Sequence, residues 1–344
     1  MKTGTLRLTR TTQKPLPAFP PGAPDLVQQS FGASGEVYCS RKTEGIGCLN
    51  ALYSSRSRMS NSQKAAIAQY LSTGEHDPLF SDWPGAHLAA RGRQGAFELR
   101  DALVSSVISR TPYATARQEL RGMDLAPFAR KKLEPMVRGL FSRREQQAVL
   151  DVLAHSVVFL TPAIIEDVLN QSRYLKTAWI LSNIYLASCG SERLSDDAPD
   201  LVGLSEDTTC YVSMDYFKPN GQFDDFVVHE AAHILHNCKR RTIGLPEIGG
   251  RERLLDIEFG KRETFAYACE GYSRIRELGR SVAAYRELFL KLENGPTPPD
   301  DRVIAREYLD VLSLAVAARN GWKQILQNCQ PSDGRHASLK IRPG

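Results

Sequence analysis

The sequence lacks the patterns that define several common classes of protein. It has no C-x-x-C pair, so neither a disulfide framework nor a zinc site built from thiolates is indicated. It also has no zinc-finger, RNP, glycine-rich phosphate-loop or G-x-S-x-G pattern, and so shows no standard nucleic-acid signature and no serine-hydrolase nucleophile. The cysteines are odd in number and scattered: Cys39, Cys48, Cys189, Cys210, Cys238, Cys269 and Cys329. In a chain this long they favour a reducing compartment, where they serve as small buried apolar residues.

Long apolar runs are missing as well. The N-terminal residues contain no continuous apolar segment of the kind found in secretory signals, and no run approaches the length of a membrane span. We therefore expect a cytoplasmic protein. Residues 1–35 hold four basic residues before the first acid, Asp25, and five prolines lie between positions 15 and 24. This composition predicts a flexible tail, and the alternative interpretation is an export or docking signal for a specialised secretion system.

The overall composition is that of a globular protein. The chain has 344 residues, of which 42% are hydrophobic and 24% charged, and this is enough for a buried core in one large or two ordinary domains. The net charge is +5, and a basic helical stretch between residues 117 and 145 contributes much of it. A basic helix face can contact nucleic acid or acidic lipid, but it is more often a solvated surface, so no nucleic-acid partner is expected.

Apolar residues at three- and four-residue spacing predict helices in much of the first 200 residues. The predicted ranges are 60–70, 94–109, 127–141 and 142–154. Thr161-Pro162 is a further helix start, with a capping residue followed by proline. Residues 175–187 are so apolar that periodicity does not distinguish a buried helix from a strand. Residues 190–204 are predicted to form a loop, and residues 208–217, rich in β-branched and aromatic side chains, to form a strand.

The most informative segment is residues 227–233, which contain the pattern H-E-x-x-H. Side chains at positions i and i+4 lie about 40° apart around a helix, so the imidazoles of His229 and His233 can bind one metal ion together. Glu230 then projects beside the metal, where a carboxylate can take a proton from a water molecule. The pattern therefore predicts a hydrolytic zinc site.

The residues around the motif predict the limits of its helix. Asn220 or Gln222 is the expected start, and Gly244 with Pro246 ends the segment. On such a helix His236 lies on the same face as the two motif histidines, and apolar side chains occupy the opposite face. We therefore expect one face to pack in the core and the other to face a cleft.

A third metal ligand has to come from another part of the chain. The metzincin pattern requires glycine three residues and histidine six residues after His233, and the presence of His236 and Lys239 at these positions excludes that class. A glutamate on a second helix is the other common solution. The acidic candidates are Glu247, Asp256, Glu258, Glu263 and Glu270.

Glu263 is the predicted third ligand because it begins a helix that has polar and ionisable side chains on one face and apolar side chains on the other. With Glu263 at 0°, Tyr267 lies at about 40° and Glu270 at about −20°, whereas Phe265 and Ala268 point away. Glu270 is the rival ligand, and otherwise it is expected to support a histidine through a hydrogen bond.

These residues resemble those of a known family. The H-E-x-x-H helix, the strand expected before it and the later E-x-F-A helix look like the gluzincin group of zinc peptidases, and HEAAHILH followed by RETFA is most similar to the ImmA/IrrE-like metallopeptidases. The resemblance covers about residues 205–280. It implies one zinc ion, with His229, His233 and Glu263 as its ligands and Glu230 as the catalytic base. The helix-turn-helix that often accompanies those peptidases is not evident, so a repressor-cleaving role is not implied.

We therefore expect a predominantly helical α+β protein that acts on a protein or peptide substrate. The predicted organisation is a basic, proline-rich tail (1–35), a mainly helical region of unknown role (36–200), a zincin-like domain with a small sheet (201–330) and a flexible C-terminal tail (331–344). The stabiliser of the oxyanion stays open among His236, Tyr267, Tyr272, Arg274 and His336. His236 could instead be a ligand, a partner of a ligand or a polar residue at the rim of the cleft, and one of the latter two is favoured. Two other functions also stay open: a non-peptidase zinc amidohydrolase, and a helical binding or effector protein with a vestigial metal site.

Overall fold

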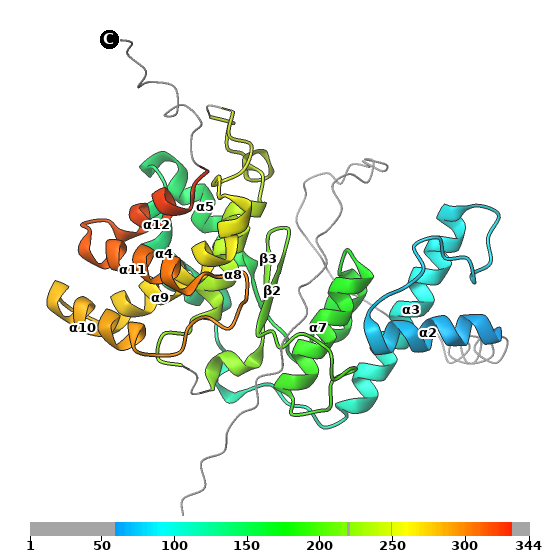
Figure 1. Ribbon diagram of the computed structural model, residues 1–344. Helices are drawn as coiled ribbons and strands as arrows, with labels where there is room; N and C mark the ends of the chain where they lie inside the picture. The colour runs from blue at the N-terminus through cyan, green and yellow to red at the C-terminus, as the bar shows by residue number, and fades with distance from the viewer. Residues whose placement is uncertain (1–58, 219–220, 249, 332–344) are drawn as a thin grey trace, which may run out of the picture. The chain divides into compact units, whose positions relative to one another are not determined.

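The predicted fold class is confirmed by a computed structural model, which describes residues 59–218, 221–248 and 250–331 (Figure 1). These ranges contain eleven α-helices and one small sheet. The chain divides into two compact units, residues 1–66 and 67–344, and the candidate site lies in the second unit. Both predicted tails lie outside the described residues, apart from Pro331. None of the described helices combines the length and apolarity needed to cross a membrane.

Helices α2 (Asn61–Thr73) and α3 (Leu88–Arg110) confirm two of the helices expected in the first 200 residues. Two more follow, α6 (Ile165–Gln171) and α7 (Leu175–Ser188), and α7 is a helix where the sequence left helix and strand open. The predicted start at Thr161-Pro162 is a turn that leads into α6, which itself begins three residues later. Eleven of the fourteen residues of α7 are buried, which explains why its sequence shows no amphipathic period. Helices α3, α6 and α7 pack against one another.

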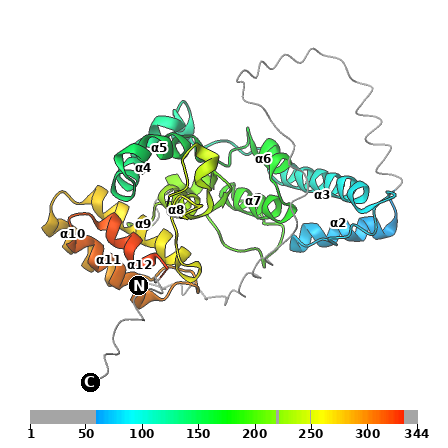
Figure 2. The ribbon, with the colours of Figure 1, turned by 90° about the horizontal axis from the view of Figure 1, so that it is seen from above.

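A larger group of helices packs together with the two helices that carry the candidate site (Figure 2). It includes α4 (Leu125–Leu140), α5 (Arg143–Ser156), α10 (Val282–Glu293), α11 (Ala305–Ala317) and α12 (Gly321–Cys329). Buried side chains of all five helices belong to one hydrophobic cluster with the two helices that carry the site. The core of the site therefore includes helices from before residue 200, and the predicted boundary near that residue stays a prediction.

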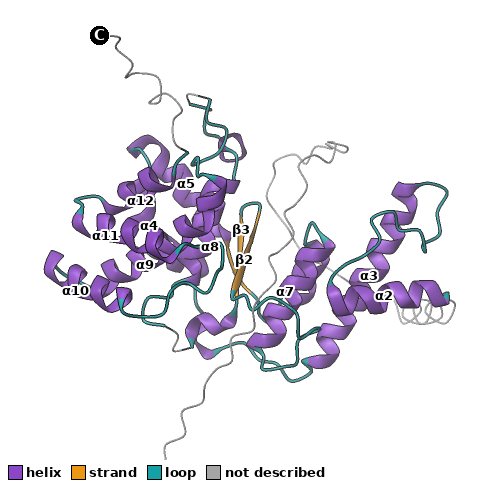
Figure 3. Ribbon diagram, viewed as in Figure 1, coloured by secondary structure: helices purple, strands orange, loops and turns teal. Residues whose placement is uncertain are grey.

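The sheet has three short strands in the order β1-β3-β2 (Figure 3). Strand β1 (Val157–Phe159) pairs parallel with β3 (Thr209–Val212), and β2 (Gly203–Glu206) pairs antiparallel with β3. The strand predicted for residues 208–217 is therefore less than half as long as expected, because a 3₁₀ helix follows it at Met214–Phe217. Strands β1 and β2 are too short to give a two-residue period, and sequence reasoning missed them.

The two site helices are α8 (Phe226–Asn237) and α9 (Arg262–Leu278), and they pack directly against each other. Helix α8 also contacts β2 and β3, so one of its sides faces the sheet (Figure 1). Its apolar residues Val227, Ala231 and Ile234 are fully buried, as the predicted apolar face requires.

Candidate metal centre

The motif helix is shorter than predicted at both ends. It begins at Phe226, after the N-cap residue Asp225, whose side chain accepts a hydrogen bond from the Val228 N–H. The predicted starts at Asn220 and Gln222 are wrong, because the buried Asp225 satisfies the first turn of the helix.

The C-terminal end of α8 also differs from the expectation. The helix ends at Asn237, and a separate 3₁₀ helix, Arg240–Ile243, continues to Gly244. Gly244 adopts the left-handed conformation, with φ of 73°, and so ends the second helix rather than the first. The side chain of Arg240, at the start of this 3₁₀ helix, is fully buried and forms an ion pair with Glu145 of α5.

The three predicted ligands come together at one point. The Nε2 atoms of His229 and His233 are 3.2 Å apart, as expected for one face of a helix. The Glu263 Oε2 atom, from the first turn of α9, lies 3.4 Å from the His233 Nε2 and 3.8 Å from the His229 Nε2. All three atoms lie within 4.8 Å of one another.

These separations fit a tetrahedral metal ion. Zinc bonds of about 2.0–2.1 Å place the donor atoms of a tetrahedral site about 3.3–3.4 Å from one another. The three distances between the donor atoms, 3.2, 3.4 and 3.8 Å, lie close to this value. Two imidazoles and one carboxylate also leave one position of a tetrahedron open. The donor atoms and their spacing therefore fit a tetrahedral zinc ion with one open position.

Glu270 lies on the opposite side of the His229 ring from this cluster. Its Oε2 atom is 3.1 Å from the His229 Nδ1, and its Oε1 atom accepts the Asp225 N–H at 2.6 Å. Glu270 therefore supports His229 rather than competing with Glu263 for the same position. A carboxylate on Nδ1 fixes the ring and directs the Nε2 lone pair outward.

His233 has a corresponding support from its own helix. Its Nδ1 atom lies 3.0 Å from the His236 Nε2, and the His236 Nδ1 lies 3.2 Å from the Asn237 Oδ1. Burial and the neighbouring His233 lower the pKa of His236 to about 3, so this ring is neutral. Only one proton assignment makes both contacts hydrogen bonds, with His233 donating to His236 and His236 donating to Asn237. The His233 Nε2 then also carries a lone pair toward the cluster.

Glu230 is buried and lies against strand β2. The Ser205 hydroxyl is 2.6 Å from the Glu230 Oε2 and 2.8 Å from the Glu230 main-chain oxygen, so it can donate to either. A Cβ atom added at Gly203 would lie 2.7 Å from the Glu230 Oε1. The carboxylate of the expected base therefore needs glycine at position 203. Neither Ser205 nor Gly203 was predicted, because no local pattern links β2 to a helix twenty residues away.

The charges at the cluster favour a cation. Burial alone lowers the pKa of His229, but the hydrogen bond to Glu270 and the charges of Glu270, Glu230 and Glu263 raise it to about 9. Burial alone raises the pKa of Glu263, but the contact with His233 and the charges of His233, His229 and Arg302 lower it to about 2. The site therefore stabilises positive charge at His229 and negative charge at Glu263.

The other candidates from the sequence lie elsewhere. Glu247, Asp256 and Glu258 are exposed and are not part of the cluster. Tyr272 packs edge-on against Trp322 in the core, with ring centroids 4.9 Å apart, and so cannot reach a substrate. His336 lies outside the described residues.

Two of the candidates for the oxyanion have different surroundings. The side chain of Arg274 donates to the Gln222 carbonyl and pairs with Glu277. The Tyr267 ring, in contrast, packs edge-on against His229, with ring centroids 4.4 Å apart. Tyr267 therefore stays a candidate, whereas the partners of Arg274 direct it away from the cluster.

Comparison with protein-family models, curated proteins and solved structures finds no match to this chain. The function is therefore inferred from the geometry and chemistry of its own side chains.

Proposed function

We propose that this protein is a zinc-dependent metallopeptidase. The proposal rests on one observation: donor atoms of His229, His233 and Glu263 converge within 4.8 Å, and Glu230 adjoins His229 on the same helix. When bound in such a site, zinc lowers the pKa of a water molecule toward neutrality and polarises the carbonyl of a substrate. The other chemical roles belong to residues of the chain.

Glu230 is the proposed general base. Its Oε2 atom is held by Ser205, which leaves Oε1 to accept a proton from the attacking water. The same carboxylic acid can then deliver that proton to the leaving amine. Because Glu230 and Ser205 are fixed on a helix and an adjacent strand, the base is positioned before the substrate arrives.

Tyr267 is the proposed donor to the developing oxyanion. Burial, followed by the charges of Glu270, Asp300 and Glu263, raises the pKa of Tyr267 well above its ordinary value, so the phenol keeps its proton at neutral pH. We expect Tyr267→Phe to lower kcat by about 10-fold or more while zinc content stays unchanged. Steady-state kinetics and metal analysis of the same preparation test this. Unchanged kcat would assign the oxyanion to another group.

The position of β2 supports a peptide substrate over a small amide. Among the described strands only β3 pairs with β2, so β2 is an edge of the sheet. An extended peptide can add to such an edge through main-chain hydrogen bonds. Ser205, which contacts the proposed base, is a residue of this strand. A peptide that pairs with β2 would therefore run past Glu230.

Zinc content measured beside activity tests the proposal. We expect the wild type and Glu230→Gln to bind one equivalent of zinc, and His233→Ala to lose it. A wild-type protein that holds no stoichiometric zinc after chelation and reloading would refute the enzyme and favour a binding protein with a vestigial site.

Cleavage mapping separates a peptidase from an amidohydrolase. Proteins exposed to the wild type should gain new termini that do not appear with Glu230→Gln, because only the wild type retains the base. Zinc binding without any new termini would favour an amidohydrolase that acts on small molecules.

We also propose a reducing compartment such as the cytoplasm. All five cysteines among the described residues are unpaired, and four of them are buried. Treatment with a thiol reductant should therefore leave the unfolding temperature unchanged.

A further inference from the structure

Arg302 reaches the candidate metal centre from a segment that no motif indicated. It lies between α10 and α11, and its Nη1 atom is 3.0 Å from the Glu263 Oε1. The other oxygen of Glu263, Oε2, faces the two imidazoles. The two oxygens of this carboxylate therefore have separate partners, one in the cluster and one on the guanidinium.

Arg302 is itself held in place by Asp300. The Arg302 Nε donates to both Asp300 oxygens at 2.9 and 3.2 Å, and the Arg302 main-chain N–H donates to the Asp300 Oδ1 at 2.9 Å. The Asp300 side chain is 15% exposed, against 53% for Arg302. Asp300 holds the guanidinium whether or not a metal is bound, so metal binding does not have to fix a free arginine side chain.

We propose that Arg302, braced by Asp300, is a positioning residue that orients the Glu263 carboxylate so that a single oxygen faces the metal. This inference rests on the proposed zinc site. A planar guanidinium suits the role because its separate N–H groups can contact two carboxylates at once, which a lysine ammonium does with less directional control.

Arg302 acts on Glu263 through the direction of its N–H groups rather than through a change in the net charge of the site. A lone cation beside a metal ligand would repel the metal, but the charge of Asp300 offsets that of Arg302. Replacing Arg302 alone would leave Asp300 unpaired and would change both orientation and charge. The informative variant is therefore the double substitution Arg302→Gln with Asp300→Asn, which keeps the net charge.

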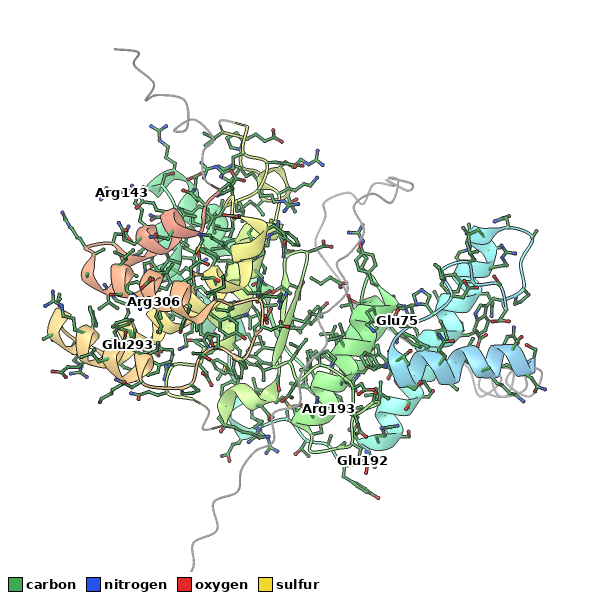
Figure 4. The ribbon with its side chains drawn as sticks, viewed as in Figure 1. Glu75, Arg143, Glu192, Arg193, Glu293 and Arg306 are labelled. Atoms are coloured by element: carbon green, nitrogen blue, oxygen red, sulfur yellow. The ribbon has the colours of Figure 1, made fainter. Side chains whose placement is uncertain are left out.

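A neighbouring pair of the same residue types provides a matched control. Arg306 and Asp310 on α11 form an exposed ion pair, with the Arg306 Nε 3.1 Å from the Asp310 Oδ1. Arg306 is labelled in Figure 4. The double substitution Arg306→Gln with Asp310→Asn makes the same change of charge and chemistry without touching the cluster.

The experiment measures the zinc Kd of wild type and both double variants by competition with a chelator at fixed pH. The absorption spectrum of the cobalt-substituted proteins and the unfolding temperature of the metal-free proteins are measured alongside. We expect the Arg302/Asp300 variant to bind zinc about 10–100-fold more weakly and to show an altered cobalt spectrum, as is typical when the partner of a metal ligand is removed. The control should match the wild type in Kd and spectrum.

The outcomes separate this inference from the proposed function. If the wild type and the Arg302/Asp300 variant bind zinc with the same Kd, the proposed role of Arg302 is overturned and the zinc site still stands. A wild type that does not bind zinc overturns both. If the double variant fails to fold, Arg302→Lys replaces it: a weaker Kd supports the inference, and a wild-type Kd overturns it.

Discussion

Asp225 joins three helices, and its replacement should destabilise the whole site. The residue is 1% exposed. Its Oδ2 atom lies 2.7 Å from the Lys132 Nζ of α4, and its main-chain N–H donates to Glu270 of α9. Its side chain also caps α8. A change at this residue therefore acts on the packing of α4, α8 and α9 together.

The size of the effect follows from these contacts. Breaking a buried ion pair by removing one partner costs about 3–5 kcal/mol. Lys132 keeps a second partner, Glu277, at 2.8 Å, and the Glu277 side chain is 47% exposed. We therefore expect about 2–3 kcal/mol for Asp225→Asn, which keeps a capping side chain. Asp225→Ala also loses the cap and should cost about 1 kcal/mol more.

Urea and thermal unfolding of the metal-free protein measure this prediction. For a unit of this size, 2–3 kcal/mol lowers Tm by about 3–5 °C. Glu277→Gln is the control, because it removes only the exposed partner of Lys132 and should cost less than about 1 kcal/mol. If Asp225→Asn and Glu277→Gln lower the free energy of unfolding equally, the reasoning about burial is wrong.

Two further predictions concern the base and a buried ion pair. Gly203→Ala should displace Glu230 and so lower kcat/KM by about 10-fold or more, without changing zinc affinity. The control is Gly260→Ala, where the added Cβ meets no atom within 4 Å, and it should leave kcat/KM and zinc affinity unchanged. A wild-type kcat/KM for Gly203→Ala would contradict this prediction. Burial alone raises the pKa of Glu145, but hydrogen bonds from Arg240 and Ser142 bring this pKa below its ordinary value of 4.5. The ionised Glu145 side chain therefore stabilises the fold above pH 4.5, and this stabilisation is lost as the pH falls through the folded pKa. Urea unfolding between about pH 5 and about pH 3 should therefore show a steeper loss of stability for the wild type than for Glu145→Gln, and equal slopes would refute the assignment.

Much of the fold could be predicted where apolar periodicity is strong. Helices α2, α4 and α5 lie close to their predicted ranges, α3 begins six residues before its range at Leu88, and α9 begins one residue before the predicted start at Glu263. The ends of α8 were wrong because capping is a matter of individual contacts: the buried Asp225 starts the helix, although earlier residues have equally suitable side chains. Helix α7 was ambiguous because burial on all sides leaves no polar face to mark the period.

The residues of the candidate centre that share a helix follow from the local sequence alone. His229 and His233 are brought together by the geometry of one turn, and Glu230 adjoins them for the same reason. These relations are local, so they can be inferred before any tertiary structure is known.

The way in which the two site helices meet, in contrast, is known only from the tertiary structure. It placed Glu263 on the Nε2 side of the imidazoles and Glu270 on the Nδ1 side of His229, a distinction that angles within α9 do not contain. It also brought Ser205 to Glu230 and Arg302 to Glu263. These contacts depend on the packing of α8 against α9 and the sheet. Periodicity reports which face of a helix is buried, but not which residue of another element lies opposite it.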